Sequence, residues 1–191
     1  RSMMLTCLAP KAGDTSQNKN ETSMVLHVKY KSFDVMLMGD LEKEGEKDLI
    51  RRKKLPQLLE GGNKIEVLKA GHHGSKGATS EELLDILKPQ IAVLSYGKGN
   101  RYGHPAPETI ERLEKANCPA VSTEKCGEIT FFCLKNEKIL VMNTEEKFWN
   151  TAWEKKFPKV DVVHLKKADF DHGGTRCQGA RLSDSDIMIF M

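Results

Sequence analysis

Apolar and polar positions near the start of the chain predict a β-hairpin. The run Ser23–Tyr30 alternates toward its end, and Phe33–Met38 is a short apolar run after a Lys-Ser turn. Alternation is typical of a half-buried strand, whereas a continuous apolar run indicates a strand buried on both faces. We therefore expect a hairpin whose second strand lies inside the fold and ends at Gly39-Asp40.

The rest of the pattern repeats one order of elements, namely a strand, a polar or glycine-rich loop and a helix. Strands are predicted at 65–68, 91–95, 120–122, 128–133 and 138–143, and helices at 41–60, from Ser80 to before Pro89, and at 107–117. Ser80 is a credible N-cap, and Pro107 suits the first turn of the last helix. Such units predict an α/β layered fold in which loops at one sheet edge carry the chemistry.

Length and composition limit the possible classes of protein. With 191 residues and 39% hydrophobic content, the chain is long enough for one domain and too short for two ordinary ones. We expect a domain at 3–143 and an appendage at 144–191. The 30 basic and 27 acidic residues leave a formal charge of +3, which is too balanced to indicate a dedicated nucleic-acid binder.

Cysteines and apolar runs bear on the compartment. The five cysteines form no CxxC pair, so neither a disulfide framework nor a zinc finger is indicated, and a reducing, cytoplasmic location is expected. No apolar run approaches about 18 residues, and no leader pattern is visible, so we predict neither a membrane segment nor a signal peptide.

The candidate chemistry lies in loops that follow three separate predicted strands. These loops carry Asp40, the pair His72-His73, and His104. Asp40 alone is more simply a helix cap, and the histidine pair alone fits a metal site or a polar loop equally well. Convergence of all four at one edge is the more economical interpretation, because flanking glycines let imidazoles approach a ligand closely. Imidazole and carboxylate groups suit Zn²⁺, Mn²⁺ or Fe, and a carboxylate can bridge two ions.

Four segments together carry a family resemblance. They are Asn20–Leu26 (NETSMVL), Leu37–Glu42 (LMGDLE), Leu68–Lys76 (LKAGHHGSK) and Asn100–Pro105 (NRYGHP). In order and spacing, over about residues 3–133, the chain resembles the hydrolase domain of the ComEC-type DNA-uptake competence proteins, which belong to the metallo-β-lactamase superfamily. The resemblance implies a layered αββα sandwich, of which this chain holds the second half in a partial or permuted form.

The resemblance also implies roles for individual residues. In that family the Asp of the Gly-Asp motif bridges two metals, which implies the same for Asp40, and one histidine of the pair ligates the second ion. We assign that ligand to His73 and leave His72 to face the substrate or metal-bound water. The implied catalytic residues are Asp40, His72, His73 and His104, and the implied substrate-binding residues, able to contact a phosphate, are Ser75, Asn100, Arg101, Tyr102 and His104.

The chain departs from the family in its principal ligand motif, His-x-His/Asp-x-Asp-His, which belongs upstream of Gly-Asp. A related segment lies instead at Val160–Gly174, with Lys167 at the position of the first histidine. It can be a permuted half-site, a vestigial repeat of Ile65–Gly74, or an unrelated strand and loop. On the first interpretation the metal ligands are Asp40, His73, Asp169, Asp171 and His172. Because a lysine ammonium has no free lone pair, we expect at most one well-occupied ion, and an empty site is also consistent.

Two functional hypotheses from different classes follow. The leading one is a metal-dependent hydrolase, using Zn or Mn, that acts on a phosphodiester such as DNA or a smaller one. The rival is a non-catalytic partial fold that serves as a binding or assembly module. Missing upstream ligands favour the rival, whereas Asp40, His73 and the Asn100–Pro105 loop favour the enzyme. On either hypothesis, a homodimer or a partner chain is a possible source of the missing half.

Overall fold

The computed structural model describes residues 3–52, 55, 58–59, 64–133, 139–143, 160–164 and 187–190. The chain divides into two units, Arg1–Ala120 and Val121–Met191.

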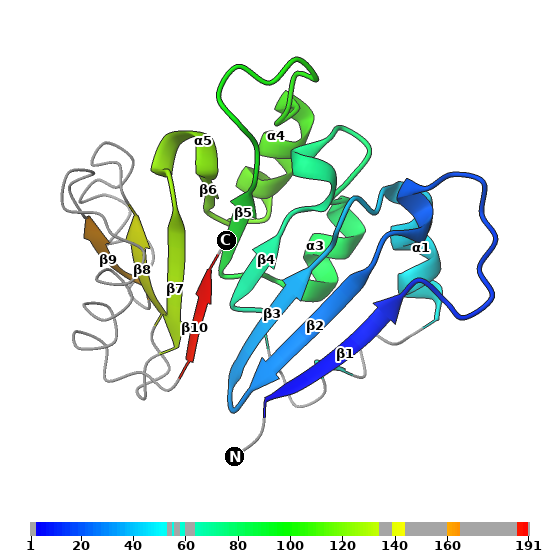
Figure 1. Cartoon of the computed structure of the whole chain (residues 1–191), viewed down its shortest axis with the longest axis horizontal. Coiled ribbons are helices and arrows are strands. Elements are labelled where there is room, and N and C mark those ends of the chain that lie inside the picture. The colour runs from blue at the N-terminus through cyan, green and yellow to red at the C-terminus, as the bar shows by residue number, and fades with distance from the viewer. Residues whose placement is uncertain are drawn as a thin grey trace. The chain divides into compact units, whose positions relative to one another are not determined.

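The first unit is built on a mixed sheet (Figure 1). Its strands are β1 (Met4–Ala9), β2 (Val25–Tyr30), β3 (Phe33–Leu37), β4 (Val67–Lys69) and β5 (Ile91–Leu94), in that order across the sheet. Strand β6 (Ala120–Ser122), which contains the boundary between the units, follows β5 in the strand order. Strands β1, β2 and β3 are antiparallel neighbours, whereas β4 and β5 run parallel to β3. The carboxyl ends of β3, β4 and β5 therefore meet at one edge.

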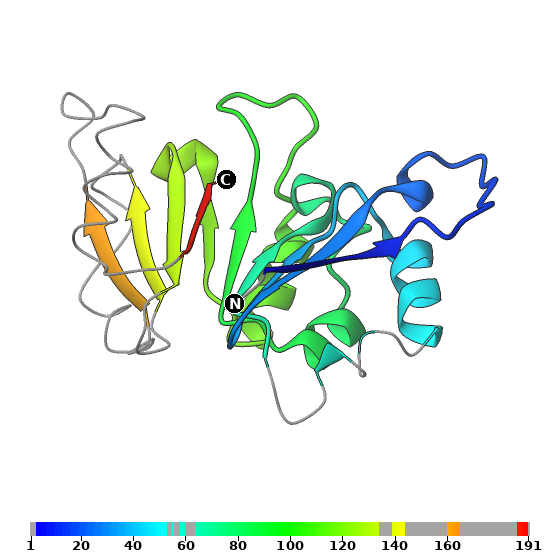
Figure 2. The same cartoon turned by 60° about the horizontal axis from the view of Figure 1, so that its bottom comes forward.

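Helices cover one face of this sheet (Figure 2). They are α1 (Lys43–Arg51), α3 (Glu81–Leu87) and α4 (Pro107–Lys115). Their buried leucines form one core cluster with alternate residues of the strands, such as Met36, Leu68 and Ala92. Two short 3₁₀ turns, η1 (Asn20–Thr22) and η2 (Gly71–Gly74), lie in the loops before β2 and after β4.

The second unit contains a short helix and a four-stranded sheet. Its elements are α5 (Thr123–Cys126), β7 (Ile129–Cys133), β8 (Ile139–Asn143), β9 (Val160–His164) and β10 (Ile187–Phe190). The strand order is β10-β7-β8-β9, with β7 antiparallel to β8 and β10, and β8 parallel to β9. Buried side chains at Phe131, Phe132 and Val141 show that apolar packing supports this sheet.

The predicted α/β class is confirmed, and so is the hairpin, which is formed by β2 and β3. The Ser80 hydroxyl caps α3 by accepting the Leu83 N–H at 3.3 Å, as predicted. Of the helix predicted at 41–60, α1 accounts for Lys43–Arg51. Strand β1 and helix α5 were not predicted. The αββα sandwich and the boundary at 143 stay predictions.

Among the described residues, no helix is long and apolar enough to cross a membrane.

Candidate functional site

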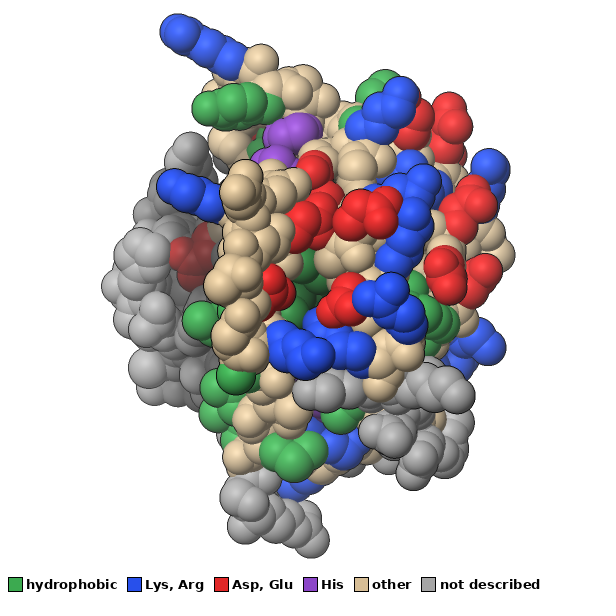
Figure 3. Space-filling view, turned by 90° about the vertical axis from the view of Figure 1, so that its right-hand side faces the viewer, with side chains coloured by type: hydrophobic (Ala, Val, Ile, Leu, Met, Phe, Trp, Pro, Cys, Tyr) green, Lys and Arg blue, Asp and Glu red, His purple; other side chains and the backbone are tan. Residues whose placement is uncertain are grey.

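The topology of the first unit brings the predicted site loops together. Asp40 follows β3, the histidine pair forms η2 after β4, and the loop that ends at His104 follows β5. Because these three strands are parallel, their carboxyl ends lie at the same edge, where ligand sites of open α/β sheets commonly form. In Figure 3, histidine side chains reach the surface at this edge close to a group of acidic side chains.

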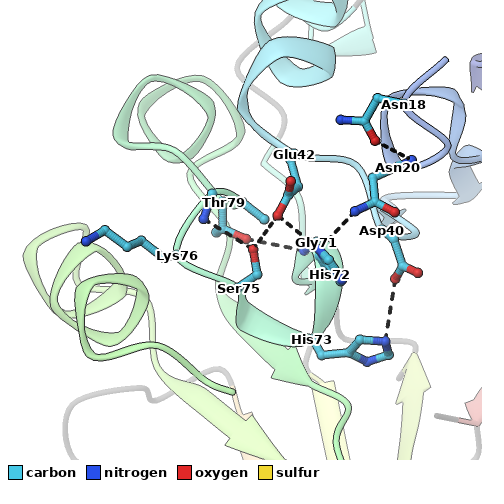
Figure 4. Close-up of polar contacts among 12 residues, drawn as sticks. Asn18, Asn20, Asp40, Glu42, Gly71, His72, His73, Ser75, Lys76 and Thr79 are labelled. Carbon is cyan, nitrogen blue, oxygen red and sulfur yellow. Dashed lines mark hydrogen bonds and ion pairs between the residues drawn. The ribbon is translucent and has the colours of Figure 1, made fainter. Parts of the chain in front are cut away.

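Asp40 and His73 lie as close together as the sequence predicted (Figure 4). His73 Nε2 is 3.6 Å from Asp40 Oδ1, and the side chains are 43% and 46% exposed, respectively. On the other side of the ring, His73 Nδ1 lies 2.6 Å from the Ser95 carbonyl oxygen. A carbonyl oxygen only accepts hydrogen bonds, so Nδ1 carries the proton of the neutral ring. Nε2 therefore has a free lone pair directed toward Asp40.

The turn that presents the two histidines has an uncommon backbone. His72 (φ 41°, ψ 50°) and His73 (φ 57°, ψ 19°) both lie in the left-handed region, where each non-glycine residue costs about 1–3 kcal/mol. Glycines make room on both sides. A Cβ at Gly71 would lie 2.6 Å from the Leu41 carbonyl oxygen, and Gly74 itself has φ +84°. The turn accepts this strain and places both imidazoles at the open edge of the sheet.

His72 contacts a different carboxylate, that of Glu42. Its Nδ1 lies 3.0 Å from Glu42 Oε1, and the Ser75 hydroxyl donates to the same oxygen at 2.7 Å. The Asn20 amide nitrogen is 3.5 Å from His72 Nδ1. The Ser75 hydrogen bond, followed by the contacts with His72 and Asn20, lowers the pKa of Glu42 below its usual range. The predicted substrate residue Ser75 is thus buried and already bonded within the protein.

His104 completes a group of three imidazoles. Its ring centroid is 5.5 Å from that of His72 and 6.4 Å from that of His73. Burial, together with the neighbouring His72 and His73, lowers the pKa of His104. Tyr102 stacks beside this ring at 6.1 Å and is 84% exposed.

The other predicted substrate residues lie on the loop after β5. The Asn100 side chain closes this loop: its amide nitrogen donates to the His104 carbonyl at 2.7 Å, and its oxygen accepts the His104 N–H at 3.0 Å. This places Asn100 as a support of His104. Arg101 is exposed beside Tyr102. The substrate contacts of Asn100, Arg101 and Tyr102 stay predictions.

Hydrogen bonds from two helices hold the loop between η2 and α3. Arg112 of α4 donates to the carbonyl oxygens of Lys76, Ala78 and Thr79. The buried Glu46 carboxylate of α1 accepts the Thr79 and Ser80 N–H groups at 2.6 and 2.9 Å. These bonds attach the loop that follows the histidines to the packed helices, which fixes the position of the loop beside the site.

The donor set of the Asp40–His73 pair fits two ligands of a divalent metal ion. A metal-binding histidine commonly donates its other ring N–H to a carbonyl or carboxylate, as His73 does to Ser95. Within the described parts of the chain, no group of three or more His, Cys, Asp or Glu side chains is arranged to hold an ion. The predicted ligands Asp169, Asp171 and His172 lie outside the described residues. Their part in a site stays a prediction.

Sequence reasoning assigned no role to three residues at this edge, Asn20, Glu42 and Lys69. Asn20 belongs to the segment NETSMVL and Glu42 to the segment LMGDLE, and the presence of their polar side chains in these two segments was the available signal. Burial lowers the pKa of Lys69, while the nearby Asp40 carboxylate opposes that shift. A lysine that ends a buried strand just before the histidine turn was the signal for this cation.

The chain is similar to competence and recombination proteins of several bacteria. It is 39% identical over 124 residues to ComE operon protein 3 of Bacillus subtilis, a match that covers 65% of this chain and 15% of that protein. It is 34% identical over 110 residues to Recombination protein 2 of Haemophilus influenzae, covering 58% of this chain and 13% of that protein. It is also 32% identical over 113 residues to Competence protein ComA of Neisseria gonorrhoeae, covering 59% and 15%.

The chain therefore spans only about a seventh of the length of these relatives. No protein-family model matches it.

Proposed function

We propose that this chain is part of a metal-dependent phosphodiester hydrolase of the metallo-β-lactamase superfamily, acting on DNA during competence. The observation that carries the proposal is the Asp40–His73 pair, because a half-exposed carboxylate and a free imidazole nitrogen lie 3.6 Å apart at the edge where parallel strands end. Similarity to a protein named for competence and to one named for recombination supports the biological setting. We infer the metal ion and the hydrolytic reaction from the ligand atoms that Asp40 and His73 offer.

Each residue of the edge has a proposed task. Asp40 and His73 would hold a divalent ion through a carboxylate oxygen and Nε2, and Ser95 keeps His73 in the tautomer that this requires. The ion, when bound, supplies positive charge that activates water and offsets charge on phosphoryl oxygens. His104 and Tyr102, together with Arg101, face the substrate from the loop after β5.

Two ligands bind an ion weakly, so the proposal requires further donors. Asp169, Asp171 and His172 are the candidates within this chain, and a second copy or a partner chain is the alternative source. The experiment therefore begins with metal binding and proceeds to turnover.

The 191-residue chain would be titrated with Zn²⁺ and with Mn²⁺ by calorimetry, and compared with the Asp40→Asn variant. An amide carries no charge to balance the cation, so we expect affinity to fall on the order of 100-fold. Asp85→Asn is the matched control, because Asp85 is an exposed aspartate on α3 that lies outside the site. Equal affinity in wild type and Asp40→Asn would overturn the assignment of the ligand.

Turnover separates the enzyme from the non-catalytic module. The loaded protein would be assayed with bis(4-nitrophenyl) phosphate and with single- and double-stranded DNA. Metal-dependent release of product that is lost in Asp40→Asn supports the hydrolase. Binding of metal without release of product, in the presence of every candidate ligand source, would leave the chain as a binding or assembly module.

A further inference from the structure

We propose that Glu42 is a positioning residue that fixes the tautomer of His72, so that His72 presents Nε2 to the same open space as His73 and His104. This inference rests on the proposed function for what His72 then does, and on contacts alone for how Glu42 holds it. Glu42 contacts His72 and Ser75, and it acts on the site through His72.

The side chain of Glu42 does not cap helix α1, although Glu42 is the residue just before it. It occupies the N-cap position of α1, and its side chain makes no capping hydrogen bond. The N-cap side chain that normally accepts a backbone N–H of the first turn is a shorter one, such as Asp or Ser. Here Glu21 of η1 accepts the Gly45 N–H of that turn instead. Because Glu21 takes over the cap, the Glu42 carboxylate is free to turn toward η2 (Figure 4).

The contacts of Glu42 determine which nitrogen of His72 carries the proton. Oε1 of the Glu42 carboxylate accepts the Ser75 hydroxyl proton at 2.7 Å, and a carboxylate oxygen only accepts hydrogen bonds. His72 Nδ1, at 3.0 Å from that oxygen, is therefore the donor in the closer of its two contacts, since the Asn20 amide nitrogen, which itself only donates, lies farther away at 3.5 Å. This leaves the Nε2 lone pair free. His73 reaches the same state through the Ser95 carbonyl. Two adjacent histidines thus expose the same atom through two different acceptors.

The shared exposure of Nε2 gives His72 a use in the proposed reaction. The His72 ring centroid lies 6.0 Å from that of His73 and 5.5 Å from that of His104, so the three rings border one space. Within that space, Nε2 of His72 can accept a hydrogen bond from water or from a protonated substrate oxygen. With the opposite tautomer it would present a donor instead.

Long-range ¹H–¹⁵N spectra of the imidazole rings test the proposal directly in the metal-free 191-residue chain. The spectra would be recorded at roughly pH 8, above the usual histidine pKa of about 6.5. We expect His72 and His73 of the wild type to carry the proton on Nδ1. In Glu42→Ala, His72 should change to mainly Nε2–H while His73 is unchanged, since Ser95 still holds it. Glu42→Gln, whose side-chain oxygen can accept the same proton, should keep the Nδ1–H form as the major one.

Glu44→Ala is the matched control, because Glu44 lies on the same helix and pairs with Lys47 at the surface. A wild-type His72 that is mainly Nε2–H overturns the proposal even if Glu42→Ala fails to fold, and so does a His72 tautomer unchanged in a folded Glu42→Ala. In the loaded protein we expect Glu42→Ala to reduce kcat about 10- to 100-fold. If the wild type binds no metal while the tautomer changes as expected, the proposed function fails and the positioning role stands.

Discussion

Two histidine–carboxylate pairs, one within the sheet of the first unit and one in the loops at its edge, differ in what they can do. In the inner pair, His27 Nε2 is 2.6 Å from Asp34 Oδ1, and the side chains are 0% and 1% exposed. In the outer pair, His73 Nε2 is 3.6 Å from Asp40 Oδ1, and the side chains are 43% and 46% exposed. Asp34 lies near the start of β3 and Asp40 beyond its end, so one strand carries a carboxylate of each kind.

Partners inside the protein explain the difference. The second oxygen of Asp34 accepts a hydrogen bond from Lys29 at 2.7 Å, and the Asp34 N–H donates to the buried Glu66 carboxylate at 2.7 Å. Gln90 donates to the other oxygen of Glu66 at 3.1 Å. The inner carboxylates are thus bonded to the protein, and the one ring nitrogen of His27 without a hydrogen bond in the described structure, Nδ1, is buried. In the outer pair the groups are half-exposed, so the free nitrogen of His73 can be reached from solvent. The same residue types therefore support the fold at one place and offer ligand atoms at the other.

Removing one carboxylate from each pair is the strongest test of this comparison. Asp34→Ala leaves Lys29 and the buried His27 without their partner, so we expect the free energy of unfolding to fall by about 3–5 kcal/mol. Asp40→Ala removes a half-exposed group and should change it by less than about 0.5 kcal/mol. Urea unfolding followed by circular dichroism measures both, and equal losses would end the distinction between the pairs.

The inner cluster should also make stability depend on pH. Burial raises the pKa of Glu66 from its usual 4.5 to about 7. The folded state therefore holds this proton more tightly than the unfolded state. Its stabilising effect is complete below about pH 4.5 and is lost as the pH rises through about 7, a change of up to about 3 kcal/mol. Glu66→Gln should lack this loss. Unfolding free energies of the two proteins that run parallel from about pH 5 to pH 8 would contradict the argument.

The outer pair should make stability depend on metal. A divalent ion at about 100 times its dissociation constant stabilises a folded protein by about 2.7 kcal/mol. We expect Zn²⁺ or Mn²⁺ to stabilise the wild type and Glu66→Gln to this extent, and to leave Asp40→Asn nearly unchanged. Thermal melts with and without the ion supply the measurement. A stabilisation that survives in Asp40→Asn would place the ion elsewhere.

The hydrophobic pattern predicted those elements of the fold that depend on residues close together in the sequence. The apolar run of β3 and the Ser80 cap of α3 were readable because each depends on neighbours in the sequence. Strand β1 was not readable, since Met4 and Leu5 are exposed although apolar, and the strand exists through its pairing with β2. Helix α5 is a single turn of four residues, too short for a periodic pattern.

The sequence predicted which residues belong to the site, but it did not predict most of the contacts among them. Asp40 and His73 could be placed together because parallel strands end at one edge. The link from Glu42 to His72 could not, because it depends on Glu21 capping α1 from a separate turn. Likewise, nothing in the sequence separates the buried His27 from an exposed histidine, since that depends on packing across three strands.

The smallest expected effect concerns Tyr102, the most exposed aromatic side chain near the outer pair. Tyr102 is 84% exposed and its ring stacks beside that of His104, so Tyr102→Ala should change the free energy of unfolding by less than about 0.5 kcal/mol. If the edge binds DNA, the same change should weaken binding of a single-stranded oligodeoxynucleotide by about 1 kcal/mol, because a base loses an aromatic surface on which to stack. Fluorescence anisotropy gives the affinity.

Tyr30→Ala is the control. The Tyr30 ring lies 5.0 Å from the Lys31 ammonium at the end of β2, and loss of the ring should cost about 0.5–1 kcal/mol of stability and leave DNA binding unchanged. Equal weakening in the two variants would mean that the oligodeoxynucleotide binds without using the histidine edge.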